Sequence, residues 1–194
     1  NFVNVDADNN AVDIENITVT GIGLRNVSTL KNISSGSFRF INSENPIDLA
    51  NSGTTLRLMT SVSALSDNEV ILTGDESLQT RPMGLLMNAL WPLGIETESL
   101  NDNEKAPILI KPGYVGGETN IYGNVSSQFI SSILISAPLS EQGVTLYVLP
   151  EFKSKPYVDM TLDIMKKFGA KTLKGYYLKH ETCDMDHQSC RIDE

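Results

Sequence analysis

Cysteine is scarce in this sequence, because two residues among 194 are too few for a disulfide framework. A reducing compartment is therefore the default, and we expect a cytoplasmic protein. Cations are also in deficit: the net charge of −9 leaves no basic stripe that could displace counterions from a nucleic acid. No apolar run approaches membrane-spanning length, and no charged-then-apolar signal sequence opens the chain. We therefore expect neither a nucleic-acid partner nor a membrane.

The composition that remains is that of an ordinary globular protein, with 40% hydrophobic and 20% charged residues. The length suffices to bury a core, as one large domain or two small ones. No linker divides the chain, so we interpret it as one α/β domain. Its first residues already alternate as in a strand, which favours a piece of a longer protein.

A repeat of 74 residues is the most informative pattern in the sequence. The segment 65–72 is matched by 139–146, and both copies continue into a second helix that ends at a glycine. So long a period excludes a short solenoid repeat and predicts a duplicated α/β unit. The anchors of the first copy are Gly53, Leu65, Val70 and Pro82, and those of the second are Ser127, Leu139, Val144 and Pro156.

The coarse secondary structure follows from hydrophobic spacing. Alternation over residues 1–41, which include Phe38 and Phe40, predicts short antiparallel strands. The order after that is helix, strand, helix and two strands, twice over. Helices are predicted at 52–65, from about Pro82 to 93, at 126–137 and at 156–168, and strands at 70–73, 107–111, 119–122, 144–149 and 171–179.

The same spacing predicts which helix faces point inward. These faces carry Leu56, Met59, Val62 and Leu65 in the first helix, Leu86, Leu90 and Leu93 in the second, Phe129, Ile130, Ile133, Leu134 and Ala137 in the third, and Tyr157, Met160, Ile164 and Phe168 in the fourth.

Two helix starts are rich in hydrogen-bond donors. A helix N-terminus presents unpaired N–H groups and a partial positive charge, so oxyanions bind there. Gly53 lets a ligand approach the backbone closely, although an ordinary Asn or Ser cap would explain residues 51–55 equally well. Ser126, Ser127 and Gln128 offer more donors than one cap requires. This surplus favours a bound ligand.

A cation precedes a proline at the second helix of each copy, as Arg81-Pro82 and Lys155-Pro156. Proline suits the first helical turn, but a cation there opposes the helix dipole. Two such placements suggest an anion between charge and dipole, although each cation alone could be a solvated surface residue. Arg57, one turn into the first helix, could equally be a structural ion-pair partner.

All histidines and cysteines lie in the tail. They could be drawn as a zinc site, but their spacing fits no familiar finger, so we expect a polar tail and no metal. The sequence also lacks a glycine-rich phosphate loop and a GxSxG elbow. The four residues concerned are His180, Cys183, His187 and Cys190.

Taken together, the motifs resemble those of the 5-enolpyruvylshikimate-3-phosphate (EPSP) synthase family, the 3-phosphoshikimate 1-carboxyvinyltransferases. The likeness runs from about residue 45 to 170. It rests on Asn-Ser-Gly-Thr-Thr-Leu-Arg at 51–57, Leu-Thr-Gly-Asp at 72–75 with Arg-Pro-Met-Gly at 81–84, Gly-Asn-Val-Ser-Ser-Gln-Phe at 123–129, and Ser-Lys-Pro-Tyr-Val-Asp at 154–159.

The resemblance implies a fold of two domains, each an inside-out arrangement of three βαβαββ units. This chain would then be one α/β substrate-binding lobe over 1–178, with leading strands and units at about 45–120 and 121–178. Residues 179–194 would be a tail and the start of the crossover to a second domain that the chain lacks.

The resemblance also implies a reaction: transfer of the enolpyruvyl group of phosphoenolpyruvate to the 5-hydroxyl of shikimate 3-phosphate, without metal or cofactor, in aromatic amino acid biosynthesis. By position, Ser126, Ser127 and Ser154 would hold the shikimate phosphate, and Tyr157 would line its ring. Gln128 would lie between the two substrates. Arg81 and the Gly53 backbone would bind phosphoenolpyruvate, in the space that the inhibitor glyphosate occupies.

The chain departs from the family where the chemistry is concentrated. The family's early Lys-Ser…Arg segment and the acid/base residues of its second domain have no counterpart here. We therefore expect weak shikimate 3-phosphate binding and no turnover from these 194 residues. Two alternatives stay open: the sibling transferase that acts on UDP-N-acetylglucosamine, and a non-catalytic anion-binding half-domain.

Overall fold

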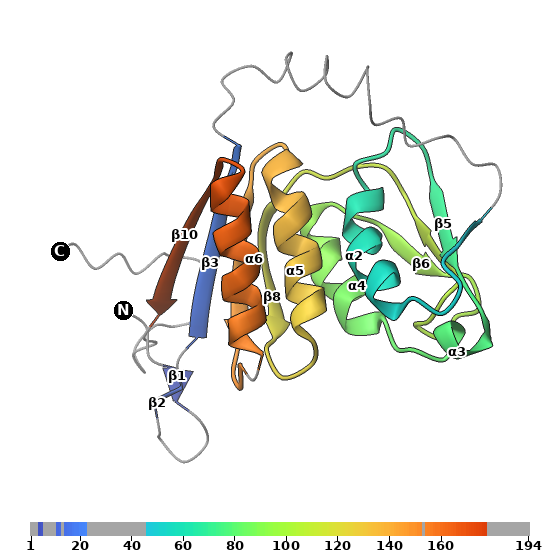
Figure 1. Cartoon of the computed structure of the whole chain (residues 1–194), viewed down its shortest axis with the longest axis horizontal. Helices are drawn as coiled ribbons and strands as arrows, with labels where there is room; N and C mark the ends of the chain where they lie inside the picture. Colours follow the sequence, from blue (N-terminus) through green and yellow to red (C-terminus); the bar gives the residue numbers. More distant parts are fainter. Residues whose placement is uncertain (1–3, 6–10, 13, 23–45, 153, 178–194) are drawn as a thin grey trace.

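The computed structural model describes residues 4–5, 11–12, 14–22, 46–152 and 154–177 (Figure 1). The helices are α2 (Gly53–Ser63), α3 (Glu76–Gln79), α4 (Gly84–Leu90), α5 (Ser127–Ser136) and α6 (Lys155–Lys167), with 3-10 turns η1 (Trp91–Leu93) and η2 (Ala137–Leu139). The strands are β1 (Asn4–Val5), β2 (Ala11–Val12), β3 (Ile14–Ile22), β4 (Ile47–Asp48), β5 (Val70–Thr73), β6 (Thr97–Ser99), β7 (Ile108–Ile110), β8 (Gly117–Tyr122), β9 (Val144–Leu149) and β10 (Ala170–Tyr177).

The two four-stranded sheets share one arrangement. In the first, of order β4-β5-β7-β6, β5 pairs parallel with β4 and antiparallel with β7. In the second, of order β8-β9-β3-β10, β9 pairs parallel with β8 and antiparallel with β3. The place that β7 holds in the first sheet is therefore taken in the second by β3, which precedes both repeats in the sequence.

Each predicted helix and strand of the repeats is found, and the sequence missed α3 and β6. The strands expected on either side of residues 112–117 exist as β7 and β8, but they belong to different sheets. In the leading segment, β1 and β2 pair antiparallel as expected, whereas β3 is a nine-residue strand of the main sheet. Phe38, Phe40 and residues 178–179 lie outside the described residues.

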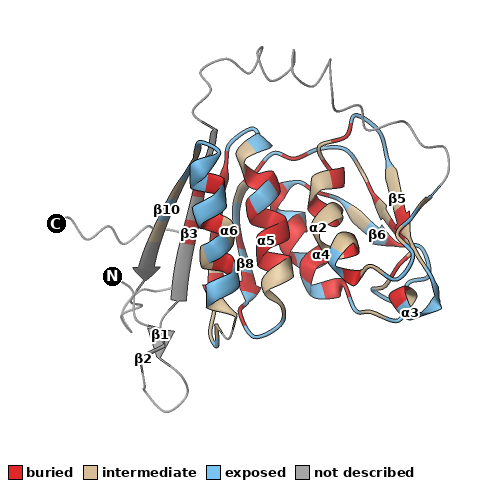
Figure 2. Ribbon diagram, viewed as in Figure 1, coloured by how far each residue is buried: buried red, intermediate tan, exposed pale blue. Residues whose placement is uncertain are grey.

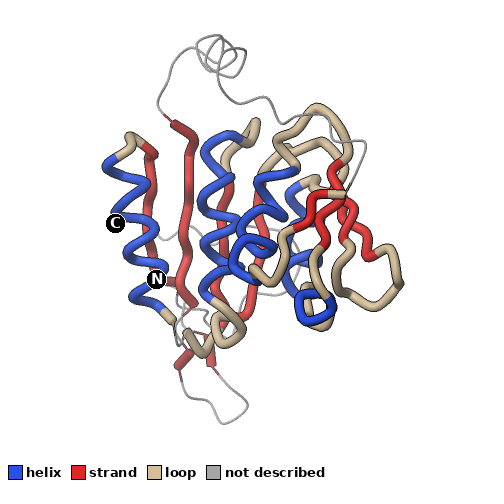
Figure 3. Tube along the Cα trace, turned by 45° about the vertical axis from the view of Figure 1, so that its right-hand side comes forward, coloured by secondary structure: helices blue, strands red, loops and turns tan. Residues whose placement is uncertain are grey.

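The long helices form a layer across the strands. α2 packs against α5, and α5 packs against α6, as Figures 1 and 3 show from two directions. In β9, Val144, Leu146 and Val148 are buried, because alternate side chains of a strand point to one face of the sheet. On α5 the predicted inward residues are all buried, which confirms that face. The predicted leucines of α4 and η1, Leu86, Leu90 and Leu93, are buried too.

The inward face of α2 differs from the prediction. Leu56 is buried, but the other buried positions are small or hydroxyl-bearing (Gly53, Thr60, Ser61 and Ser63), while Met59, Val62 and Leu65 are only partly covered. The reason is its neighbour: Ser61 Oγ lies 2.6 Å from the carbonyl oxygen of Ser132 and 2.7 Å from its hydroxyl, on α5. Hydrophobic spacing alone does not reveal a helix contact made by hydroxyl groups.

The predicted inward face of α6 is wrong. Tyr157, Met160, Ile164 and Phe168 are 62%, 53%, 50% and 83% exposed, and the buried residues are Val158, Leu162 and Met165. Figure 2 shows α6 largely exposed where α5 is almost wholly buried. The matching helix α4 packs against β8 of the other sheet, so α4 is covered on two sides. Within the described ranges no strand covers α6 in the same way.

We expect Leu162→Ala to lower the free energy of unfolding by about 2–5 kcal/mol, because it removes a buried side chain from the α6 interface. Ile164→Ala, two residues along the same helix, should cost less than about 1 kcal/mol because that side chain is half exposed. Urea unfolding of both variants measures the difference. Equal losses of unfolding free energy in the two variants would show that Ile164 also faces inward, as the hydrophobic spacing predicts.

Tyr114 should make stability depend on pH at the alkaline end. Burial raises the pKa of its hydroxyl to about 12, against the smaller opposite effect of a hydrogen bond from Ser136. Because the folded-state pKa lies above the unfolded value, the contribution is complete below about pH 10 and is lost as pH rises toward 12. We expect roughly 2–3 kcal/mol of stability to disappear over that window. Urea unfolding of Tyr114→Phe should lack this component of the pH dependence.

Candidate functional site: helix starts at the repeat boundary

The start of α2 is capped by Ser52. Its Oγ accepts a hydrogen bond from the Thr55 amide at 3.3 Å and lies 2.6 Å from the Thr55 hydroxyl. The first turn contains no acidic residue, so no carboxylate opposes the partial positive charge of this helix end. Ser52 is thus an ordinary serine cap, one of the two alternatives that the sequence left open. The other backbone amides of the first turn of α2 still lie at the positive end of the helix dipole.

Arg81 lies over the α2 start rather than at the start of its own helix. α4 begins at Gly84, after Pro82, and the Arg81 side chain reaches back so that Nη2 donates to Asn51 Oδ1 at 2.9 Å. A Cβ on Gly53 would overlap Arg81 Nη1, so the glycine makes room for the guanidinium. The prediction that Pro82 lies in the first turn of its helix is therefore wrong, and Arg81 lies beside Gly53, the residue with which the family resemblance groups it.

The polar side chains at the start of α5 form a cap and a contact with the first repeat. Ser126 Oγ accepts from the Gln128 amide at 3.3 Å, which makes Ser126 the cap. Gln128 Oε1 accepts from Arg57 Nη1 at 2.7 Å, and Gln128 Nε2 donates to Thr54 Oγ1 at 2.9 Å. The surplus of donors predicted here exists, and one of them joins the two helix starts directly.

The hypothesis that Arg57 is a structural ion-pair partner is wrong for the described residues. No described carboxylate pairs with it; instead it lies 5.4 Å from the Phe129 ring centroid and donates to Gln128. Burial lowers the pKa of Arg57, and repulsion from Arg81 lowers it further. Two guanidinium groups therefore face one region, and an anion there would relieve their repulsion. Residue spacing contains no signal for this contact, because it crosses between helices.

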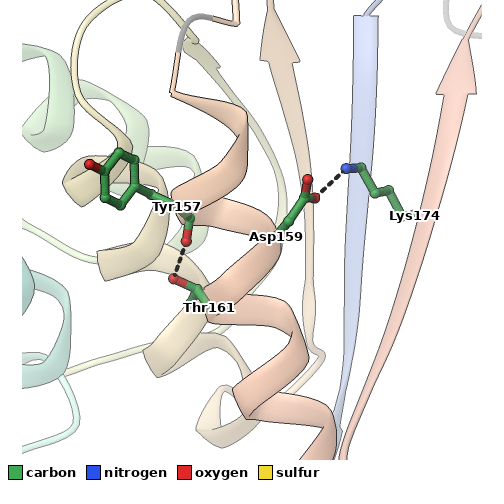
Figure 4. A network of polar contacts seen from close by, with 4 residues as sticks. All are labelled: Tyr157, Asp159, Thr161 and Lys174. Carbon is green, nitrogen blue, oxygen red and sulfur yellow. Dashed lines mark hydrogen bonds and ion pairs between the residues drawn. The ribbon is translucent and has the colours of Figure 1, made fainter.

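The start of α6 leaves its serine hydroxyl out of the cap. Ser154 occupies the cap position, but no side-chain cap bond forms, and Pro156 lies in the first turn as predicted. Figure 4 shows Tyr157 on the side of α6 opposite Asp159, whose carboxylate binds Lys174 of β10 at 2.6 Å. The exposed Tyr157 ring stands one turn from Ser154.

Topology brings the α5 and α6 starts to one edge. β8 and β9 run parallel, and each leads into one of these helices, so both helices begin at the carboxyl edge of the pair, the usual ligand side of α/β sheets. The Gly123 amide donates to Leu149 O at 2.9 Å, which ties the two strand ends together. Two surface cavities lie elsewhere, beside Lys171 and Leu173 and beside Trp91 and Glu98. Ser126, Ser127, Gln128 and Ser154 at the two helix starts are partly exposed.

The part of the chain that the structure describes shows neither a metal site nor a membrane-spanning helix. It contains no group of three or more histidine, cysteine, aspartate or glutamate residues that could hold a metal. None of its helices has the length and apolar character needed to cross a bilayer. The tail with His180, Cys183, His187 and Cys190 lies outside the described residues, so the zinc question is not tested.

Comparison with known proteins gives consistent matches. The family model for EPSP synthase (3-phosphoshikimate 1-carboxyvinyltransferase) matches residues 9–178. A 3-phosphoshikimate 1-carboxyvinyltransferase of Methanobrevibacter smithii is 70% identical over 152 residues, covering 78% of this chain and 35% of that protein. The one of Methanothermobacter thermautotrophicus is 59% identical over 123 residues, covering 63% and 29%. The chain therefore spans about a third of the length of these curated relatives.

A solved structure supports the fold. EPSP synthase from Acinetobacter baumannii superposes with a TM-score of 0.56 at 22% identity, over 67% of this chain and 30% of that one. This likeness concerns the backbone arrangement alone.

Gly53→Ala tests the placement of Arg81. Alanine favours a helix by up to about 1 kcal/mol over glycine, but here its Cβ must displace the guanidinium. We expect the substitution to leave stability unchanged or lowered in the native background and to raise it in the Arg81→Ala background. Thermal unfolding of the four proteins of this cycle measures the coupling, and simple additivity would show that Arg81 does not lie over Gly53.

Proposed function

The chain belongs to the EPSP synthase (3-phosphoshikimate 1-carboxyvinyltransferase) family, and we propose that it is a substrate-binding lobe of a cytoplasmic enzyme of this activity. The whole enzyme transfers the enolpyruvyl group of phosphoenolpyruvate to the 5-hydroxyl of shikimate 3-phosphate. The 5-hydroxyl gives up its proton to a base as its oxygen adds to C2 of phosphoenolpyruvate, and C3 takes a proton from an acid; loss of a proton from C3 and of phosphate from C2 then restores the double bond.

The observation that carries the proposal is the pairing of helix N-termini with arginines at the repeat boundary. Both substrates carry a phosphate and a carboxylate, so their binding requires local positive charge in a chain of net charge −9. The starts of α2 and α5, together with Arg57 and Arg81, supply it. Holding two anions together and aligned is a large part of the catalysis of a two-substrate reaction.

We assign the site residues to the two substrates as follows. Ser126, Ser127 and Ser154 bind the phosphate of shikimate 3-phosphate. Two observations support this assignment: α5 and α6 begin at the same edge of the sheet, and the Ser154 hydroxyl makes no cap bond to its own helix. The exposed Tyr157 lines the shikimate ring, and Gln128 lies between the substrates. Arg81 and the Gly53 backbone bind phosphoenolpyruvate, which their mutual proximity supports.

We further propose that the lobe contains a third βαβαββ unit beyond the two described. β8 covers α4, and on the matching side of α6 the exposed Met160, Ile164 and Phe168 would be covered by the first strands of that unit. The greater length of the relatives leaves room for this unit and for a second lobe. The second lobe would close over the open helix starts and supply the acid and base.

Calorimetry with the 194-residue chain tests the substrate assignment. We expect weak binding of shikimate 3-phosphate and none of shikimate, because the serines recognise the phosphate. Ser127→Ala should weaken binding by roughly tenfold, the effect of a hydrogen bond to a charged group. The control Ser140→Ala, whose hydroxyl bonds Ala137 O beyond the end of α5, should bind as the native chain does.

Three results would contradict parts of the proposal. Binding of UDP-N-acetylglucosamine in place of shikimate 3-phosphate would favour the sibling transferase. Binding of neither would favour a lobe without this substrate. Measurable product from the isolated chain would show that the acid and base do not come from a second lobe.

A further inference from the structure

Arg57 makes one of the two polar contacts that join the repeats at their helix starts, and Thr54 makes the other. It stands on α2, and its guanidinium donates to Gln128 Oε1 on α5 at 2.7 Å while lying over the Phe129 ring. It therefore contacts α5 through both a polar and an aromatic group. It lies one turn inside α2, behind the Gly53 and Thr54 positions that open the helix.

The chemistry of the two groups decides which way the Gln128 amide points. A guanidinium has N–H donors and no acceptor, so only the carbonyl oxygen of an amide can face it. The NH2 group is then turned to the opposite side, where one N–H donates to Thr54 Oγ1 at 2.9 Å. The described residues provide no acceptor for the second N–H. Without Arg57 the amide could rotate and present its oxygen instead.

Two features of the Arg57 environment disfavour folding and offset its favourable contacts. Its Nε is buried and has no hydrogen-bond partner among the described residues, and burial and Arg81 both lower the pKa of its guanidinium. An unpartnered buried N–H and a nearby like charge both disfavour the folded state. Stability alone therefore does not explain an arginine at this position.

We infer that Arg57 is a positioning residue, which holds the Gln128 amide with its N–H groups toward the oxygen atoms of the bound substrates. The inference rests on the proposed function, because Gln128 is assigned there to the space between the substrates. Arg57 acts through Gln128 and across the repeat boundary. It thereby couples the α2 start, assigned to phosphoenolpyruvate, to the α5 start, assigned to shikimate 3-phosphate.

The first test observes the amide itself, without substrate. In the native chain the side-chain NH2 signals of Gln128 in a ¹⁵N–¹H spectrum should differ from those of a solvated glutamine, because both ends of the amide are hydrogen-bonded. In Arg57→Met, which keeps the length of the stem and removes the donors, they should move to solvated positions. Arg57→Lys should show an intermediate shift, because an ammonium group can still donate to the Gln128 oxygen but lacks the fixed planar geometry of the guanidinium. Unchanged signals in Arg57→Met would overturn the inference.

The second test is a double-mutant cycle on shikimate 3-phosphate affinity, measured by calorimetry. Arg57→Met and Gln128→Met should each weaken binding by roughly tenfold, and the double variant should bind no worse than Gln128→Met alone. Independent losses that multiply in the double variant would overturn the inference in favour of direct contact between Arg57 and the ligand. Lys111→Met, which removes a cation from the exposed pair with Glu96, should leave affinity unchanged.

Urea unfolding separates this role from a structural one. The unpartnered Nε and the repulsion from Arg81 oppose the gain from the Gln128 bond and the Phe129 contact, so Arg57→Met should unfold at about the same urea concentration while binding more weakly. A marked loss of stability with a matching loss of binding would overturn the inference. If the native chain binds no shikimate 3-phosphate, the proposed function fails, and the Gln128 signals still decide whether Arg57 orients the amide.

Discussion

The close contact of α2 with α5 is the constraint on which the site depends. Ser61 Oγ reaches both the carbonyl oxygen and the hydroxyl of Ser132, and Ser132 Oγ donates to Leu58 O at 3.3 Å. Larger side chains at these buried positions would push the helices apart. At their present separation, a residue one turn inside α2 can bond the first turn of α5. The helix starts that belong to different repeats thereby become neighbours.

This arrangement creates local positive charge in an acidic protein. The chain carries a net charge of −9, yet the first turns of α2 and α5 contain no acidic side chain. Arg81 lies close enough to Arg57 to add to the lowering of the Arg57 pKa by burial. The field at a surface depends on nearby charges and dipoles more than on the total, because distant exposed charges are screened. Overall acidity is therefore compatible with anionic substrates.

The two sheets differ in how they are completed, and this difference explains the exposed face of α6. In the first sheet the third strand comes from the same repeat, and α4 is covered by β8. In the second, β3 comes from ahead of both repeats. Apolar side chains such as Phe168 then remain in solvent, which is unusual for a monomer and typical of a surface that another unit covers.

The sequence alone determined the helices and strands of the two repeats, the repeat itself, the family, and the residues that open the helices, because periodicity, glycine and capping residues act over a few positions. β6 and α3, of three and four residues, are too short for periodicity to show. The family resemblance already groups Arg81 with Gly53, but tertiary structure alone decided that Arg57 bonds Gln128 and that α6 turns Leu162 rather than Ile164 inward. These are contacts between elements far apart in the chain, and the spacing of residues within one helix contains no information about what packs against it.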